Sequence, residues 1–275
     1  MEITRRIAVP LVLMPWYIWG QEGVSDAEWS RFLIWYKATP PEVFRSPANV
    51  VFAAYKAKVI AEGTTPTDAG SLVAQLQARS RTDREYLRAN ANLTYSAGID
   101  GQHGLRTTEP NAFLTETVGS LQPGKALDIG MGEGRNTVFL AQKGWDVTGV
   151  DLSEVGVAKA NERARSLGVR INAQAQDINI FELGSLQWDL VCLLYFPIDE
   201  SMRNLHQRIA TSLKPGGLVI VEGVGSGGTL DALIETWHKW EPMKLRVLRL
   251  DFREGKQSDW GANRIGRLLL QKPAA

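Results

Sequence analysis

The sequence predicts a doubly wound, Rossmann-like α/β fold: a mostly parallel, seven-stranded sheet with an antiparallel edge hairpin, preceded by an N-terminal helical cap. From about residue 124, short apolar segments alternate with helical ones. This alternation is typical of a parallel sheet with helices on both faces. The last two strand-like segments, 245–252 and 264–271, have no helical segment between them. We therefore expect these two segments to pair as the edge hairpin.

The region before the sheet, residues 21–106, consists of helical segments without strand alternation. Ser25 and Glu28 have the spacing of a capping box and open the first helix. Short helices with a one-sided apolar stripe need a partner surface. We therefore expect a helical cap over the mouth of the site rather than an independent domain, and one further domain over residues 107–275. Three more helices are expected in the cap, over 49–62, from 65 onward and over 82–91.

Short apolar runs bounded by glycine, proline or polar residues predict the strands of the sheet, and longer amphipathic runs predict its helices. The strands are expected at 125–129, 145–150, 169–173, 188–195, 218–222, 245–252 and 264–271. The helices are expected at 137–143, 154–167, 200–213 and 230–240.

Composition restricts the function classes. The chain has 275 residues, 44% of them apolar and 22% charged, so it can bury a sizeable core. The formal net charge is +1 and no long run of like charge occurs, which does not favour a nucleic-acid partner. Cys192 is the single cysteine, so an internal disulfide and a cysteine-rich zinc site are excluded. No spacing of histidines and carboxylates suggests a metal site, and we expect none.

The first twenty residues leave two interpretations open. Two arginines precede an apolar run over residues 7–19, which is the form of a secretory signal and would imply export or membrane association. Alternatively, the run packs on the domain, with Pro10 and Pro15 preventing a regular helix, in a cytoplasmic protein. The run is too short to span a bilayer, which needs ~20 residues.

The most informative segment is a glycine-rich turn between a strand and a helix, LDIGMGEG at 127–134. Glycines let the backbone turn sharply and let a ligand approach, and the next helix points free N–H groups at that ligand. Arg135 stands where a dinucleotide fingerprint requires its third glycine. Asp128 is placed to pair with a cationic amine or a bridging water, and Asp151 ends the second strand, where it can accept both ribose hydroxyls. Together these features indicate a ligand with an amino acid at one end and a nucleoside at the other.

Over residues 107–272 the sequence resembles the class I S-adenosylmethionine-dependent methyltransferases. The resemblance is carried by ALDIGMGEGRN, VTGVDLS, QDI after the third strand, WDL opening the fourth, and the turn LKPGG. The segment TTEPNAFL at 107–114 makes it most similar to the small-molecule enzymes related to tellurite-resistance methyltransferases. The resemblance implies S-adenosylmethionine as the cofactor, with Asp177 contacting the adenine amino group and the Ile178 backbone N–H nearby. A nicotinamide-binding or non-catalytic Rossmann-like domain is the alternative.

The expected cofactor-binding residues come from the turn and from the ends of the strands. They are Asp128, Gly130, Met131, Gly132, Gly134, Asn136, Asp151, Leu152, Gln176, Asp177, Ile178 and Leu193.

Fewer residues in the sequence point to the binding site of the methyl acceptor. Tyr195 at the end of the fourth strand is a candidate to orient a substrate, although an aromatic there commonly packs. His103, in a loop before the glycine turn, is a candidate base, although a loop histidine is commonly only solvated. The Asn-Pro-Pro-Tyr-like motif of enzymes that methylate amino groups of bases is missing, and so is an obvious strong base. We therefore expect a small-molecule acceptor with a soft nucleophile such as a thiol or chalcogen species. A protein or RNA methyltransferase and a non-catalytic S-adenosylmethionine-binding protein are the alternatives, and no oligomeric state is indicated.

Overall fold

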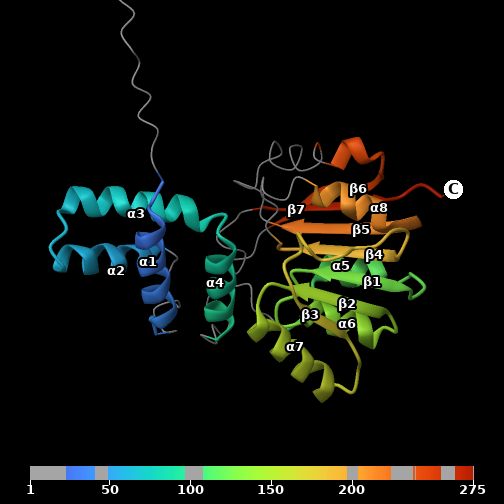
Figure 1. Ribbon diagram of the computed structural model, residues 1–275. Helices are drawn as coiled ribbons and strands as arrows, with labels where there is room; N and C mark the ends of the chain where they lie inside the picture. Colours follow the sequence, from blue (N-terminus) through green and yellow to red (C-terminus); the bar gives the residue numbers. More distant parts are fainter. Residues whose placement is uncertain are drawn as a thin grey trace, which may run out of the picture.

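In the computed structural model, the seven strands form one sheet in the order β3-β2-β1-β4-β5-β7-β6. The structure describes residues 23–40, 49–96, 108–196, 204–223, 238, 240–254 and 264–274. The first five strands of this order are parallel, while β7 runs antiparallel to both of its neighbours (Figure 1). The expected doubly wound fold and the pairing of the last two strands are confirmed.

The strands lie close to the segments expected from the sequence, except that the fifth begins five residues early, at Leu213, because it pairs with Trp188 there, and it includes the LKPGG segment expected as a turn. They are β1 (Lys125–Ile129), β2 (Asp146–Asp151), β3 (Asn172–Ala175), β4 (Trp188–Leu194), β5 (Leu213–Gly223), β6 (Arg246–Glu254) and β7 (Arg264–Gln271). Strand β3 begins three residues later than expected, because the preceding residues terminate the helix before it. Gly168 adopts a left-handed conformation with φ of 69°, and Val169 N–H donates to the Ala164 carbonyl at 3.0 Å.

Eight α-helices accompany the strands in the described part of the chain. They are α1 (Asp26–Ala38), α2 (Asn49–Ala61), α3 (Pro66–Ser80), α4 (Arg84–Ser96), α5 (Ala112–Val118), α6 (Arg135–Gln142), α7 (Glu154–Ser166) and α8 (Leu205–Ser212). Helix α5 was not expected. Asn111 begins it, because its side chain accepts from the Leu114 N–H at 3.0 Å. Most of the helix expected over 230–240 lies outside the described residues.

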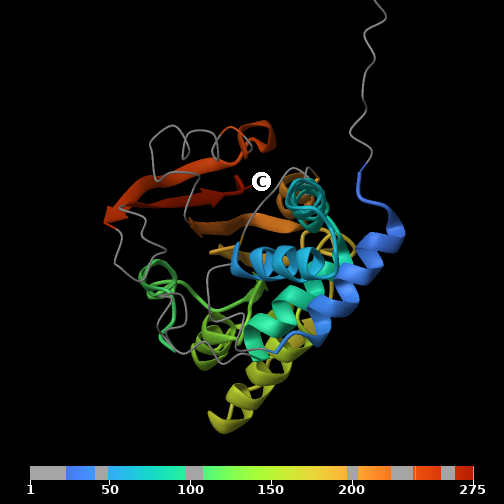
Figure 2. The same cartoon turned by 90° about the vertical axis from the view of Figure 1, so that its left-hand side faces the viewer.

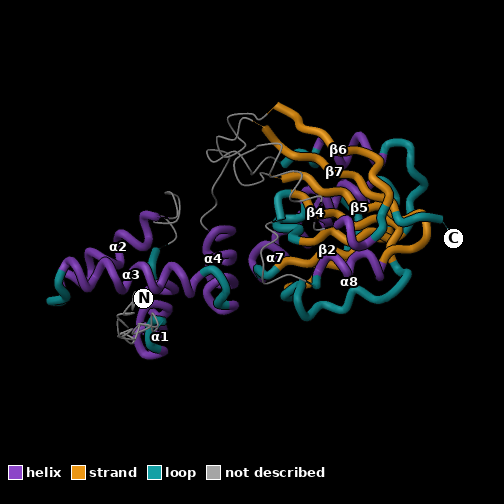
Figure 3. Tube along the Cα trace, turned by 90° about the horizontal axis from the view of Figure 1, so that it is seen from above, coloured by secondary structure: helices purple, strands orange, loops and turns teal. Residues whose placement is uncertain are grey.

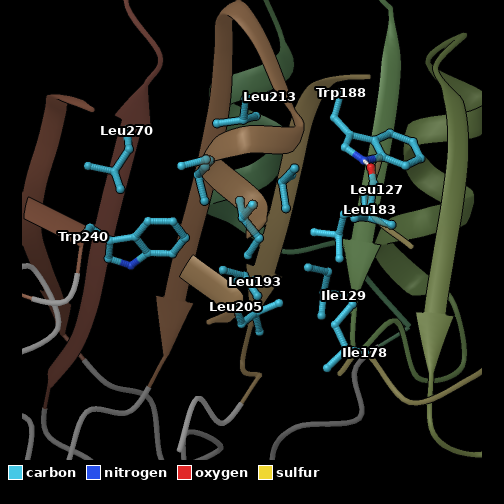
Figure 4. Close-up of a cluster of buried hydrophobic side chains, with 14 of the residues drawn as sticks. Leu127, Ile129, Ile178, Leu183, Trp188, Leu193, Leu205, Leu213, Trp240 and Leu270 are labelled. Carbon is cyan, nitrogen blue, oxygen red and sulfur yellow. Dashed lines mark hydrogen bonds between the residues drawn. The ribbon is translucent and has the colours of Figure 1, made fainter. Parts of the chain in front are cut away.

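The alternation of side chains along the strands gives the sheet two apolar layers. On one face, Leu127 and Ile129 pack with Leu193 and with Leu205 of α8 (Figure 4). On the other face, Ala126 and the alternate residues of β4 pack against α5 and α6. Asp128 has the parity of Ala126, so its side chain points toward α6 at the C-terminal end of β1.

The four N-terminal helices share an apolar core of their own. Phe32 and Tyr36 of α1 are fully buried among aromatic side chains of α2 and α4. Ser25 caps the first helix as expected, because its hydroxyl accepts from the Glu28 N–H at 3.3 Å, and it also donates to the Glu28 carboxylate at 3.0 Å. Figures 1 and 2 show the four helices beside the sheet, and Figure 3 shows α4 between the other three and α7. Helix α4 contacts α7 directly. Within the described ranges, no helix is long and apolar enough to cross a membrane.

Candidate functional site

The glycine turn joins the C-terminal end of β1 to the start of α6. Gly130, Gly132 and Gly134 all have positive φ, of 73°, 55° and 77°, which residues with a Cβ adopt only at a cost. The Gly130 N–H donates to the Val150 carbonyl at 2.8 Å, which ties the turn to the end of β2. The turn therefore lies at the carboxyl ends of two adjacent strands, where doubly wound sheets bind ligands.

The three glycines face different neighbours. A Cβ on Gly134 would lie 2.6 Å from the Cβ of Ala160, so this glycine allows α6 and α7 to pack closely. A Cβ on Gly132 would lie 2.6 Å from the Tyr95 hydroxyl oxygen, and one on Gly130 would clash with the ring of Phe196. Two aromatic side chains, one from α4 and one from the end of β4, therefore lie against the glycines of the turn.

Asp151 connects the turn to the loop after β2. One carboxylate oxygen accepts from the Gly132 N–H and the other from the Ser153 N–H, both at 2.9 Å. Burial raises the pKa of Asp151 above its usual value. The side chain is only partly buried, and each carboxylate oxygen has a further lone pair. Leu152 follows it and is also partly buried.

Asp128 lies beneath the first turn of α6 and is 1% exposed. Its carboxylate accepts from the Thr137 hydroxyl at 2.7 Å. Burial raises the pKa of Asp128 to about 6, while the hydrogen bond from Thr137 and the charge of Arg135 act in the opposite direction. The site thus contains a buried carboxylate that feels the charge of Arg135, a residue that sequence reasoning used only to reject a dinucleotide fingerprint.

The loop after β3 holds Gln176, Asp177 and Ile178. The Gln176 N–H donates to the Asp151 carbonyl at 2.8 Å, which places this loop beside the end of β2. The Asp177 carboxylate accepts from the Asn179 N–H at 2.9 Å and lies 3.1 Å from Arg84 Nε of α4. Helix α4 therefore contacts the loop in which adenine recognition is expected.

Three of the expected cofactor-binding residues direct their side chains elsewhere. Leu193 is 1% exposed within the core on the α8 side, and Met131 is 4% exposed and packs on α7. Asn136 is 6% exposed and accepts from the Asn111 N–H at 2.8 Å. For Leu193 and Met131 only the backbone remains to contact a cofactor.

A buried polar network on the acceptor side was missed by sequence reasoning. Glu222, at the end of β5, is 2% exposed and accepts from Asn111 Nδ2 at 2.6 Å and from Arg267 Nε at 2.9 Å. Arg253 of β6 donates to the hydroxyl of Tyr195 at 2.5 Å. A charged residue ending the buried run LVIVE was the available signal, but its partners lie on three other segments.

Tyr195 is the one expected acceptor-side residue that the described ranges contain. It has a positive φ of 59°, and its N–H donates to the Glu222 carbonyl at 2.7 Å. The Arg135 guanidinium lies 6.0 Å from its ring centroid. His103 lies outside the described residues. In the described ranges, no three histidine, cysteine or acidic side chains are grouped so that they could hold a metal ion.

Comparison with known proteins agrees with this geometry. Residues 126–217 match a family model described as a methyltransferase domain. The chain is 38% identical over 78 residues to hemagglutinin 1 of Eikenella corrodens, which is 28% of this chain and 25% of that protein. It is 32% identical over 111 residues to a ubiquinone biosynthesis O-methyltransferase of Bordetella avium (39% and 45%). It is 34% identical over 73 residues to the probable S-adenosyl-L-methionine-dependent methyltransferase TehB of Haemophilus influenzae (26% and 26%). The matches thus span less than half the length of each of these relatives.

Solved structures show the same fold. A 1,6-didemethyltoxoflavin N1-methyltransferase of Burkholderia thailandensis, solved with S-adenosylhomocysteine, has a TM-score of 0.54 at 20% identity, covering 68% of this chain and 87% of that one. TehB of Haemophilus influenzae has a TM-score of 0.51 at 20% identity, covering 64% and 66%.

The fold and the site define a class I methyltransferase architecture, with a glycine turn at β1 and an acidic residue ending β2. Residues 126–217 thus match a methyltransferase domain, and the relatives that share this part of the chain include an S-adenosylmethionine-dependent methyltransferase.

Proposed function

We propose that this protein is an enzyme that transfers the methyl group of S-adenosylmethionine to a small-molecule acceptor. The observation that carries the proposal is the arrangement at the ends of β1 and β2. There, Asp151 is hydrogen-bonded to the glycine turn, and the buried Asp128 lies near the end of β1, just before that turn, hydrogen-bonded to Thr137 of the helix that follows it. This arrangement offers acceptors for a nucleoside sugar and a buried negative charge for an amine, which are the groups that the cofactor presents.

Each part of the cofactor has a residue suited to it. Asp151 would accept the ribose hydroxyls, and Asp177 and the Ile178 N–H would contact the adenine. Asp128 would attract the amino group of the methionyl end, and Arg135, close to Asp128 and Tyr195, would bind its carboxylate. Gly130, Gly132 and Gly134 allow the backbone to approach, and the backbone of Met131, Leu152, Gln176 and Leu193 and the side chain of Asn136 line or support the same loops.

When bound, S-adenosylmethionine supplies a methyl group attached to a positively charged sulfur. The acceptor atom forms a bond to the methyl carbon as the carbon–sulfur bond breaks, and the sulfur keeps the electron pair of the broken bond. The residues of this chain then have to align the acceptor and exclude water. Tyr195 and Phe196, at the end of β4, are placed to do so. No base is required of the chain if the acceptor loses its proton readily, and a thiol or another soft nucleophile fits that condition.

The helical cap over residues 21–106 contributes through α4. The Tyr95 ring lies against Gly132 and Gly156, and Arg84 reaches Asp177. We infer that α4 closes the solvent side of the cofactor, while residues 107–275 carry the chemistry. The names of the relatives support small acceptors in general, since they include enzymes of ubiquinone and toxoflavin chemistry.

The experiment is calorimetric titration of the full chain with S-adenosylhomocysteine and, separately, with NAD. It is followed by incubation with methyl-labelled cofactor and a panel of thiols, selenium and tellurium oxyanions, phenols and amines. We expect binding of S-adenosylhomocysteine and labelled products of low molecular mass. Binding of NAD alone would refute the cofactor, binding without turnover on any acceptor would indicate a non-catalytic protein, and label only in protein or RNA would refute the acceptor class.

A further inference from the structure

The buried network around Glu222 lies on the side of the sheet away from the adenine-binding loop. Asn111, Arg267 and Arg253 meet its carboxylate, with Arg253 Nη2 at 3.6 Å. These partners come from the segment before α5, from β7 and from β6. The network therefore lies where β4, β5 and the antiparallel hairpin come together, beside the end of the strand that carries Tyr195.

Two guanidinium groups share this one carboxylate. The side chains of Arg253 and Arg267 are 20% and 12% exposed, whereas Glu222 is 2% exposed. The positive groups thus reach closer to solvent than the negative group that they flank. Partly buried guanidinium groups are suited to bind a carboxylate through two parallel N–H···O bonds.

Tyr195 adds a second line of evidence. Its left-handed conformation is unfavourable for a residue with a Cβ, and such strain clusters at ligand-binding positions. The conformation is fixed by the bond from its N–H to the Glu222 carbonyl, and it brings the hydroxyl to Arg253. The backbone and the side chain of this tyrosine are therefore both bound to the same network.

The position relative to the cofactor follows from Arg135. This residue begins α6 directly after the glycine turn, and its guanidinium lies 6.0 Å from the Tyr195 ring centroid. With the methionyl carboxylate on Arg135 as proposed above, the Tyr195 side chain lies between that end of the cofactor and Arg253. A small molecule that contacts Tyr195 would have one end near the methyl donor and its other end near Arg253.

We propose that Arg253 and Tyr195 bind a carboxylate group of the methyl acceptor, so that the substrate is a small organic acid whose nucleophilic atom lies a few bonds from that carboxylate. The inference rests on the proposed function and names the substrate class of the same site. Glu222 acts as a positioning residue, because it contacts Arg253 and the backbone of Tyr195 rather than the substrate, and Asn111 in turn donates to Glu222.

The test uses matched pairs of ligands that differ only in the anionic group: a carboxylic acid and its amide, for an aliphatic thiol, an aromatic thiol and a phenol. Each is titrated by calorimetry into the full chain saturated with S-adenosylhomocysteine, and each is assayed for methyl transfer. We expect at least one acid to bind roughly tenfold or more tightly than its amide, as the loss of a charge-assisted hydrogen bond predicts. Absence of acid-selective binding across the panel would overturn the proposal.

Variants separate this site from the cofactor site. In Arg253→Gln the preference for the acid should fall below about threefold, Arg253→Lys should keep part of it, and affinity for S-adenosylhomocysteine should stay within about twofold. Arg249→Gln is the matched control, because Arg249 lies on the same strand but pairs with Asp251 and Glu116. If Arg253→Gln unfolds, Tyr195→Phe tests the same preference without removing a charge. An undiminished preference in these variants would overturn the proposal, whereas failure of the wild type to bind S-adenosylhomocysteine would overturn the proposed function itself.

Discussion

The carboxylate of Asp151 accepts a hydrogen bond from the backbone N–H of Gly132 at 2.9 Å, so the end of β2 holds the glycine turn that follows β1. Removing this carboxylate leaves two backbone N–H groups, of Gly132 and Ser153, without their acceptor. We expect Asp151→Ala to weaken binding of S-adenosylhomocysteine by ~1–3 kcal/mol, as measured by calorimetry. Asp146→Ala, at the exposed opposite end of the same strand, should bind as the wild type does. Equal losses in both variants would contradict the assignment.

Gly134 tests the packing that supports the turn. In Gly134→Ala the new Cβ would lie 2.6 Å from that of Ala160 at a φ of 77°. Gly168→Ala has a similar φ of 69° with nothing within 4 Å, so it measures the conformational cost alone. We expect Gly168→Ala to lower the free energy of unfolding by ~1–2 kcal/mol and Gly134→Ala by ~1–3 kcal/mol more. Urea denaturation measures both, and Ala160→Gly in the Gly134→Ala background should recover the extra loss except for the ~0.5–1 kcal/mol that glycine costs inside a helix.

Asp128 should make stability depend on pH. Because burial raises its pKa from 3.8 to about 6, the folded protein keeps this proton where the unfolded chain has released it. The free energy of unfolding therefore falls as the pH rises from about 4 to 6, by ~3 kcal/mol from this group. Asp128→Asn lacks this effect, so its stability relative to the wild type should improve by that amount between these pH values. If urea denaturation gives free energies of unfolding that change with pH in the same way for the two proteins, the carboxylate does not titrate in this range.

The same carboxylate should control cofactor affinity in the opposite sense. An ionised Asp128 attracts the amino group of the cofactor, and a protonated one does not. We expect the affinity of the wild type for S-adenosylhomocysteine to fall as the pH drops below about 6, and Asp128→Asn to bind weakly without this pH dependence. Calorimetry across this pH range measures both affinities. If the affinity of Asp128→Asn also depends on pH, another group causes the effect.

Helix α4 should couple the helical cap to turnover. The Asn92 amide accepts from the Ser153 hydroxyl at 2.7 Å and donates to Glu154 at 2.6 Å, at the start of α7. We expect Asn92→Ala to lower the rate of methyl transfer but to change the midpoint of thermal unfolding little, because Asn92 is not part of the apolar core of the cap. Lys37→Ala, which breaks an exposed ion pair inside the cap, is the control and should retain activity.

A chain that starts at residue 108 gives the stronger form of this test. It should fold around the sheet but lose methyl transfer, measured with labelled cofactor. Full activity of the shortened chain would show that the cap is not part of the site.

The sequence was sufficient to predict the succession of most strands and helices along the chain and the glycine turn, because these depend on local periodicity and on glycine at fixed spacing. It was insufficient for the network around Glu222. Asn111 and Glu222 are 111 positions apart. Arg253 belongs to β6, which joins the sheet through β7, the strand paired with β5. Helix α5 escaped prediction for a related reason: its seven residues are too few to show a period, and only the Asn111 cap marks it.

The four N-terminal helices and the sheet each bury their own apolar core, and the contacts of α4 with α7 include amide and charged groups at Asn92, Arg88 and Lys159. The polar contacts between α4 and α7 can therefore change without any change in the side-chain packing of either apolar core. Under the proposed function, exchange of the helical segment between related chains would change the acceptor range while the methyl-transfer domain stays the same, by recombination as well as by point substitution.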